Sequence, residues 1–320
     1  MKLLSTLNCE VIPFDTTPWM TGCTRIEQIL AHRTNCGRPL KALNHSLERF
    51  CRALNGVTHV WIDKGRWIYP DILAGIKREN GATAVHYTPD PQLLLHRSRY
   101  FSQCIPLYDF VVTTKPYEME MYKQAGARNV LLVLQGYDDR FASARVSSDT
   151  RAQFESDVCF IGHCERHYAS RLRIVRNVTP GLKVWGPKWP RYACFHTWAR
   201  TCVAGHGIWG NEYACALMSS RMGLGLLSKR VPETTTTRTF EIPASGTFLL
   251  AERTEEHRSL FEEGSEAEFF DGDEELRDKV GFYLRNDDAR KRIAGAGLSR
   301  CIRSGYHVKD QLQKVLEAIV

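Results

Sequence analysis

In the first 134 residues, short runs of β-branched and aliphatic residues alternate with segments whose apolar residues recur every three or four positions. Runs of the first kind predict buried strands, and segments of the second kind predict helices. The expected strands are residues 2–7, 58–63, 83–88, 109–114 and 129–134, and the expected helices are 24–33, 40–54, 70–78 and 116–125. This alternation is typical of βαβ units in a parallel sheet.

The alternation resumes after a polar stretch at residues 135–156, which we interpret as a linker. The expected strands there are 157–161, 182–185, 222–228, 247–251 and 267–270, and the expected helices are 168–176, 211–218, 238–244, 254–261, 274–285, 288–304 and 307–320. The fold class predicted is α/β, with two doubly wound, Rossmann-like domains. Ligands of such sheets bind at the carboxyl ends of the strands.

Length and composition fit this two-domain prediction. The chain has 320 residues, of which 43% are hydrophobic and 25% charged, as in globular proteins. No apolar run reaches the ~18 residues of a transmembrane helix, and the N-terminal apolar stretch is too short for a signal peptide. The eleven cysteines are scattered without a CxxC pair, which is typical of reduced thiols. We therefore expect a cytoplasmic protein.

The charge balance favours an anionic ligand. The net charge is +7, from 43 basic and 36 acidic residues. This modest excess suits a nucleotide or a phosphate. It falls short of the concentrated basic stripe of a dedicated nucleic-acid binder.

The most informative segment is RTFEIPASGTFLL, which begins at Arg238. Arg238 and Glu241 lie three positions apart at the start of an expected helix, and Gly246 ends that helix before a buried strand. A helix N-terminus offers free N–H groups and the positive end of the helix dipole, so it can hold a diphosphate. A carboxylate one turn further on can accept hydrogen bonds from sugar hydroxyls. The alternative is a surface ion pair worth a few tenths of a kcal/mol.

Together with shorter motifs, this segment makes the sequence resemble the CgeB-like branch of the group 1 glycosyltransferases. The shorter motifs are DVCFIG at 157–162 with Arg171 downstream, VWG at 184–186, FEEG at 261–264, DEEL at 273–276, YH at 306–307, YDFV at 108–111 and QAGA at 124–127. The resemblance implies the GT-B fold, in which two Rossmann-like domains face a cleft. We expect an N-terminal domain over 1–145, a C-terminal domain over 146–306, and a final helix over 307–320 that packs back on the first domain.

The resemblance also implies an activity. The protein would be a hexosyl- or pentosyltransferase that moves a sugar from a nucleotide-diphosphate sugar to a hydroxyl acceptor. The C-terminal domain would bind the donor and the N-terminal domain the acceptor, which could be a glycan, a small molecule, a protein or a modified nucleic-acid base. No metal and no other cofactor would be needed. Two alternatives remain open: a non-catalytic nucleotide- or sugar-binding protein, and a sugar-nucleotide epimerase.

On the donor side, the resemblance places Glu241 where the family has the carboxylate that holds the nucleotide ribose. Glu233 lies eight positions earlier, at the spacing of a second glutamate near the transferred sugar, although the PETTTT sequence around it departs from the family's glycine-bearing loop. Arg238 and Arg171 match the family's pattern for binding the pyrophosphate, and Lys229 is a candidate because it follows an expected strand.

Two further donor-side candidates lie at strand ends. Gly162 ends the strand of the DVCFIG motif, at the edge where the donor is expected. Trp185 also ends a strand, so it is a candidate to lie beside the nucleotide base. Packing in the core is the alternative for this tryptophan.

On the acceptor side, three residues at strand ends are candidates. Asp90 and His86 lie near the end of the strand at 83–88, and an inverting transfer needs a general base. Two prolines fix the chain around Asp90, although Pro-Asp-Pro is also an ordinary turn sequence. Lys64 follows another strand and could reach the acceptor or a phosphate. His163 and His167 are four residues apart in an expected loop without a second ligand pair, so we expect no metal site there.

Overall fold

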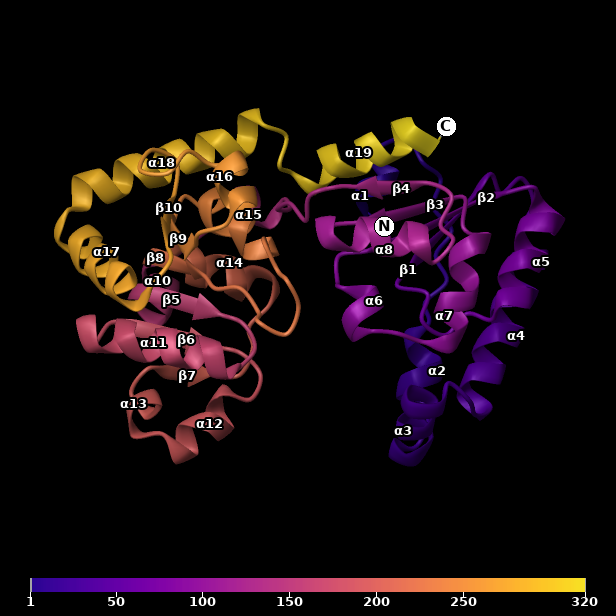
Figure 1. Ribbon diagram of the computed structural model, residues 1–320, viewed down its shortest axis with the longest axis horizontal. Helices are drawn as coiled ribbons and strands as arrows, with labels where there is room; N and C mark the ends of the chain where they lie inside the picture. Colours follow the sequence, from indigo (N-terminus) through magenta and orange to yellow (C-terminus); the bar gives the residue numbers. More distant parts are fainter. Residues whose placement is uncertain (1, 320) are drawn as a thin grey trace. The chain divides into compact units, whose positions relative to one another are not determined.

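The structure, a computed structural model, describes residues 2–319. The chain divides into two compact units (Figure 1). We call Met1–Leu134 with Gln311–Val320 the N-terminal domain, and Gln135–Asp310 the C-terminal domain. Each is built on its own parallel sheet, as the alternating pattern predicts.

The N-terminal domain has a sheet of four strands in the order β1-β2-β3-β4. These are β1 (His59–Asp63), β2 (Thr83–Thr88), β3 (Phe110–Thr113) and β4 (Val130–Leu132), all parallel. Because each strand pairs with the next one along the chain, right-handed crossovers put the connecting helices on one face. One long helix, α4 (Arg38–Arg52), precedes β1. The helices between β1 and β4 are α5 (Pro70–Asn80), α6 (Gln92–Leu95), α7 (Arg99–Cys104), the 3₁₀ turn η1 (Ile105–Leu107) and α8 (Pro116–Gln124).

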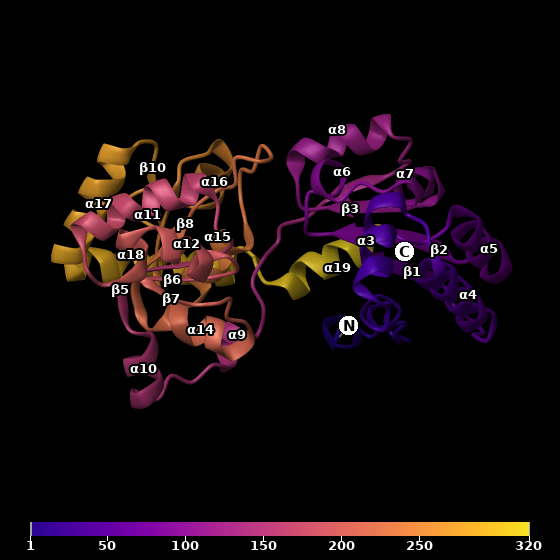
Figure 2. The ribbon, with the colours of Figure 1, turned by 90° about the horizontal axis from the view of Figure 1, so that it is seen from below.

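The opposite face of this sheet is covered by α19 (Val308–Ile319), the last helix of the chain (Figure 2). Val315 and Ile319 pack there against Val85, Val112 and Val133. The alternation of β-strand side chains explains the two layers, since Ala84 and Val111 point the other way, into the helix-covered core. The sheet is thus wound on one face only, and the C-terminus of the chain supplies the second layer.

The first residues differ from the prediction. The strand expected at residues 2–7 is instead the short helix α1 (Lys2–Ser5), because its hydrogen bonds close locally: the N–H groups of Thr6 and Leu7 donate to Leu3 and Leu4. Two more helices follow, α2 (Thr17–Thr21) and α3 (Arg25–Thr34).

The C-terminal domain has a sheet of six parallel strands in the order β10-β9-β8-β5-β6-β7. These are β5 (Ser156–Ile161), β6 (Leu182–Trp185), β7 (Val203–Gly205), β8 (Ser220–Gly225), β9 (Phe248–Glu252) and β10 (Glu268–Phe270). The chain moves outward from β5 to β7, returns to β8, and moves outward on the other side. This sheet is doubly wound, and its switch point lies between β5 and β8, where such sheets bind ligands.

Ten helices of this domain lie within the described residues. They are α9 (Arg140–Ser143), α10 (Ser148–Phe154), α11 (Arg166–Val178), α12 (Trp189–Phe195), α13 (Thr197–Arg200), α14 (Gly210–Met218), α15 (Thr237–Ala244), α16 (Glu255–Leu260), α17 (Asp273–Arg285) and α18 (Asp287–Arg303). The sequence analysis did not identify α12, α13 or β7. It treated the stretch that contains α9 and α10 as a linker.

Residues 135–145, which the sequence analysis assigned to the first domain, lie in the C-terminal one. The reason is local bonding. The N–H of Tyr137 donates to the carbonyl of Tyr306 at 3.1 Å, and the N–H of Val308 donates back to the carbonyl of Tyr137 at 2.8 Å. The two segments that connect the domains are therefore bonded to each other. Over residues 2–319, no helix combines the length and apolar character needed to cross a membrane.

Candidate active site

Arg238 lies at the switch point of the C-terminal sheet, in the first turn of α15. Its Nη1 donates to the carbonyl of Ile161, the last residue of β5, at 3.2 Å, and its Nη2 donates to the carbonyl of Leu226, just after β8, at 2.9 Å. Its guanidinium carbon lies 5.3 Å from the centre of the Phe160 ring. Within residues 2–319 Arg238 forms no ion pair, so its charge is not neutralised by a carboxylate.

The start of α15 is fixed from within the core. The N–H of Thr236 donates to Thr239 Oγ1 at 3.1 Å, and that hydroxyl is 2.9 Å from His257 Nε2. His257 Nδ1 lies 2.7 Å from the carbonyl of Glu252, and a carbonyl only accepts, so Nδ1 carries the proton and Nε2 accepts from Thr239. Burial lowers the pKa of His257 to about 4, which keeps the ring neutral. The N-terminus of α15, the positive end of its helix dipole, is thus held at the sheet edge.

Glu241 lies one turn after the N-terminus of α15 and is only 8% exposed. The Tyr213 hydroxyl, from α14, donates to its Oε2 at 2.7 Å, and Arg140 Nη2 lies 3.8 Å from its Oε1. Arg140 is held in turn by Asp138 at 2.7 Å. Burial raises the pKa of Glu241, and the contacts with Tyr213 and Arg140 oppose that shift. The sequence analysis found neither Tyr213 nor Arg140.

Lys229, a sequence candidate, forms an ion pair with Glu252 at the end of β9. Glu252 is buried, and its carboxylate also accepts hydrogen bonds from the Leu227 N–H and from His167 Nε2, each at 3.0 Å. Burial by itself would raise the pKa of Glu252, but these bonds outweigh it and hold the pKa below its ordinary value. Glu252 was not predicted, although a charged residue that ends a buried strand is a usable signal.

Gly162 and Gly186 let two strand ends approach each other closely. The N–H of Gly162 donates to the carbonyl of Trp185 at 3.0 Å, and the carbonyl of Gly162 accepts from Trp189 Nε1 at 2.9 Å. Gly186 has a φ of +149°, and a Cβ there would overlap the carbonyl oxygen of Gly162. Trp185 is 4% exposed and packs near Phe154, so its position favours the core alternative.

Gly186→Ala should therefore lower the free energy of unfolding by at least about 2 kcal/mol, from backbone strain and the overlap with Gly162. The matched control is Gly246→Ala, which also has a positive φ, of +73°, but whose Cβ would have no neighbour closer than 4.0 Å. We expect the control to cost about 1 kcal/mol. Chemical denaturation of both variants measures the difference, and equal losses would contradict the close-approach argument.

Arg171 has its charge neutralised. It lies on α11, pairs with Asp273 at the start of α17, and stands 5.8 Å from the centre of the Phe270 ring. Its side chain is 15% exposed. This arrangement gives Arg171 a role in joining α11 to α17, and it leaves Arg238 as the better candidate for an anion.

Glu233 is half-buried in the loop before α15. Its charge acts on Tyr168, whose pKa is raised to about 12 by burial; Arg238 opposes this shift, while Glu165, Glu233 and Glu252 add to it. The charges of these four groups therefore all act on one phenol. The structure brings Glu233 and Arg238 into the same region, at the carboxyl edge of β5, β8 and β9.

Trp209 is an exposed aromatic residue at the same sheet edge. It is 71% exposed, follows β7, and caps the N-terminus of α14. Tyr213, which holds Glu241, comes four residues later, about one helical turn away. The sequence analysis did not single out Trp209, although its glycine neighbours at 207 and 210 mark a loop.

In the N-terminal domain, Lys64 and Asp90 form an ion pair with each other. Their side chains are 54% and 37% exposed. Lys64 has a φ of +61°, which is strained for a lysine, and it is held in place: its N–H donates to the carbonyl of Tyr87 at 2.9 Å and its carbonyl accepts from Gln92 Nε2 at 3.0 Å. The structure thus brings two of the three acceptor-side candidates together.

His86 is separate from them. It is fully buried, with ring centres of Phe101 and Tyr108 at 4.8 and 5.2 Å, and burial lowers its pKa to about 3. β2 ends at Thr88, as the sequence predicts, but the His86 side chain faces inward from it. This position favours packing over the role of a base.

For metals, residues 2–319 contain no group of three or more histidine, cysteine, aspartate or glutamate side chains suited to hold an ion. His167, which the sequence analysis considered with His163, is bound to Glu252 instead.

The comparisons with known proteins agree with this architecture. Residues 167–317 match the family model described as glycosyl transferase-like. The chain has the two-domain GT-B fold, and its C-terminal domain resembles this glycosyltransferase family. The family match covers most of the C-terminal domain, which contains the switch point. No curated protein sequence matches this chain significantly.

Solved structures share the fold of this chain at low sequence identity. HepE of Anabaena, in complex with UDP and glucose, matches with a TM-score of 0.64 and 12% identity over 99% of this chain and 88% of its own. Sucrose-phosphate synthase of Thermosynechococcus elongatus matches with a TM-score of 0.60 and 13% identity, over 89% of this chain and 81% of its own. An alpha-glucosyltransferase in complex with UDP-glucose and DNA containing an abasic site matches with a TM-score of 0.61 and 14% identity, over 86% of this chain and 84% of its own. They confirm the predicted α/β class with two parallel sheets; of these sheets, only the C-terminal one is doubly wound as expected.

Proposed function

We propose that this glycosyltransferase moves a sugar from a nucleoside-diphosphate sugar to a hydroxyl acceptor without a metal ion. The observation that carries the proposal is Arg238, a cation without a carboxylate partner, at the switch point of the sheet and the N-terminus of α15. A diphosphate leaving group gains negative charge as the glycosidic bond breaks. A fixed guanidinium and helix N–H groups stabilise that charge.

The other donor-side groups fit around this anchor. Glu241, one turn along α15, is oriented by Tyr213 and is available to hold ribose hydroxyls. Lys229 could exchange its pairing with Glu252 for a phosphate oxygen. Trp209, exposed one turn from Tyr213, offers a face for the base and is a better candidate than the buried Trp185. Glu233 keeps its proposed place near the transferred sugar.

The ligands bound to two of the fold neighbours indicate the first donor to test. HepE and the alpha-glucosyltransferase were solved with UDP or UDP-glucose, so UDP-glucose is the first probe. The acceptor could be a glycan, a small molecule, a protein or a modified nucleic-acid base, and Lys64 and Asp90 are the proposed contacts. Release of UDP that needs an acceptor and persists in EDTA supports the transferase. Epimerised sugar, or binding without turnover, contradicts it.

Glu241→Ala should weaken UDP binding at least tenfold, since a hydrogen bond to a charged group typically contributes about 1.5–3 kcal/mol. Isothermal titration measures the affinity, and thermal unfolding checks that the variant is folded. Tyr213→Phe is the matched control, because it keeps the carboxylate and removes only the hydroxyl that orients it. It should have a smaller effect. Unchanged UDP affinity in folded Glu241→Ala would exclude the ribose role.

A further inference from the structure

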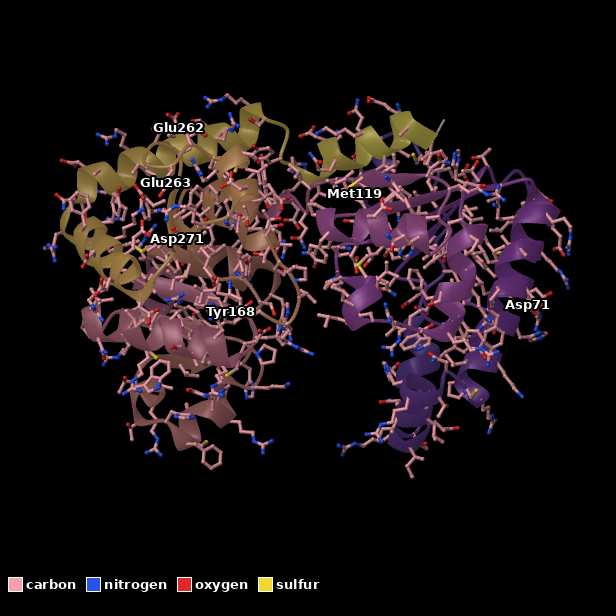
Figure 3. All side chains as sticks on the ribbon, in the orientation of Figure 1. Asp71, Met119, Tyr168, Glu262, Glu263 and Asp271 are labelled. Carbon is pink, nitrogen blue, oxygen red and sulfur yellow. The ribbon has the colours of Figure 1, made fainter. Side chains whose placement is uncertain are left out.

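Tyr168 lies next to Arg238 but has no assigned role. It is the third residue of α11, which begins just after β5 ends (Figure 3). Its ring packs edge-on against Phe160 at 5.2 Å between ring centres, and the Arg238 guanidinium lies over that same Phe160 ring. The phenol and the guanidinium therefore share one aromatic neighbour at the sheet edge.

The Tyr168 hydroxyl has no hydrogen-bond partner within the described chain, although the residue is only 4% exposed. Tyrosine hydroxyls on buried residues usually find a partner. The Tyr108 and Tyr122 hydroxyls also lack one, but they are enclosed in the N-terminal core. The Tyr168 hydroxyl, in contrast, is not fully enclosed by protein atoms, so a ligand can reach it.

Charges around the phenol select the kind of ligand. Burial raises the pKa of this phenol to about 12; Arg238 opposes the shift, and three carboxylates (Glu165, Glu233 and Glu252) add to it, so the hydroxyl is protonated at neutral pH and can donate a hydrogen bond. Carboxylates repel phosphate oxygens but accept hydrogen bonds from sugar hydroxyls. A sugar hydroxyl can accept from the phenol and donate to a carboxylate at the same time. A polyol fits this environment better than an anion does.

We propose that the Tyr168 hydroxyl donates a hydrogen bond to a hydroxyl of the transferred sugar. The inference rests on the proposed function, because it needs a bound nucleotide sugar. Tyr168 would then help to distinguish the sugar donor from the bare nucleoside diphosphate. Arg238, which also contacts Phe160, would hold the diphosphate.

The test is Tyr168→Phe, which removes only the hydroxyl. Isothermal titration with UDP and UDP-glucose should show unchanged UDP affinity and a roughly three- to tenfold loss of UDP-glucose affinity, as for one neutral hydrogen bond. Because the hydroxyl has no protein partner, the unfolding temperature should not fall. Equal losses for both ligands would place the hydroxyl on the nucleotide and overturn the inference, and so would no loss for either.

The matched control is Tyr283→Phe, whose hydroxyl donates to Glu268 at 2.5 Å in the same domain. It should lower the unfolding temperature and leave the ratio of the two affinities unchanged. Titration of the wild-type protein distinguishes a failure of the proposed function from a failure of the Tyr168 inference. If it binds neither UDP nor UDP-glucose, the proposed function and the inference fail together. If it binds both and Tyr168→Phe keeps the wild-type ratio, only the inference fails.

Discussion

Arg238→Gln should lower the turnover number by about 10²–10³-fold, which is the usual effect of removing one group that stabilises charge in the transition state. Glutamine is shorter than arginine and uncharged, and its one amide NH2 group can still donate to a carbonyl such as that of Ile161 or Leu226. The variant should therefore fold. UDP affinity should fall as well, because the ground state also carries the diphosphate charge. Steady-state kinetics and titration with UDP measure the two effects.

Arg171→Gln is the matched control for this prediction. Both arginines matched the family's pattern in the sequence, and they differ in the structure. Arg171 is paired with Asp273, whereas within residues 2–319 the hydrogen bonds of Arg238 go to carbonyl oxygens and not to a carboxylate. Arg171→Gln should therefore lower stability more than turnover. A larger loss of turnover in Arg171→Gln than in Arg238→Gln would reverse the assignment of the diphosphate anchor.

The sequence predicts the two sheets well, because hydrophobic runs and turns are local signals. The expected strands at 58–63 and 83–88 agree with β1 and β2 within one residue. It does not predict the winding of the N-terminal sheet, since strand order depends on pairing between distant segments. The packing of α19 on the N-terminal sheet is an example. The resemblance to the GT-B family implies that the last helix packs on the first domain, and the periodicity of the sequence does not.

The same limit applies to the site. Arg238 and Glu241 could be found because their chemistry lies within one short helix. Arg140 reaches Glu241 from a segment about a hundred residues earlier that has the composition of a linker. Glu252 acquires its role from three donors on two other segments. No spacing rule connects such positions, and only tertiary structure does.

The strand at 83–88 is predicted with its observed bounds, but the direction of each side chain on it is not. His86 alternates with Val85 and faces the helix-covered core together with Ala84, so its ring does not stand at the sheet edge. Asp90 stays outside the strand, between two prolines, with a partly exposed carboxylate.

Asp90→Asn should lower turnover by about 10²–10⁴-fold and leave UDP affinity nearly intact, if the carboxylate takes the proton from the acceptor hydroxyl. The ion pair with Lys64 supports this role by fixing the side chain. The asparagine keeps the size of the side chain and its contact with Thr88 through the backbone N–H, at 3.1 Å. Kinetics with a saturating donor measure the loss.

Lys64→Met separates positioning from catalysis in this pair. If Lys64 only orients the base, its removal should cost less than Asp90→Asn, and the double variant should lose no more than Asp90→Asn alone, because the two residues are in contact. If Lys64 binds the acceptor, the KM for the acceptor should rise instead. A near-wild-type rate for Asp90→Asn would exclude a base at this position. The proton would then pass to the leaving diphosphate itself, as in a retaining transfer, and catalysis would depend on Arg238 and the N-terminus of α15.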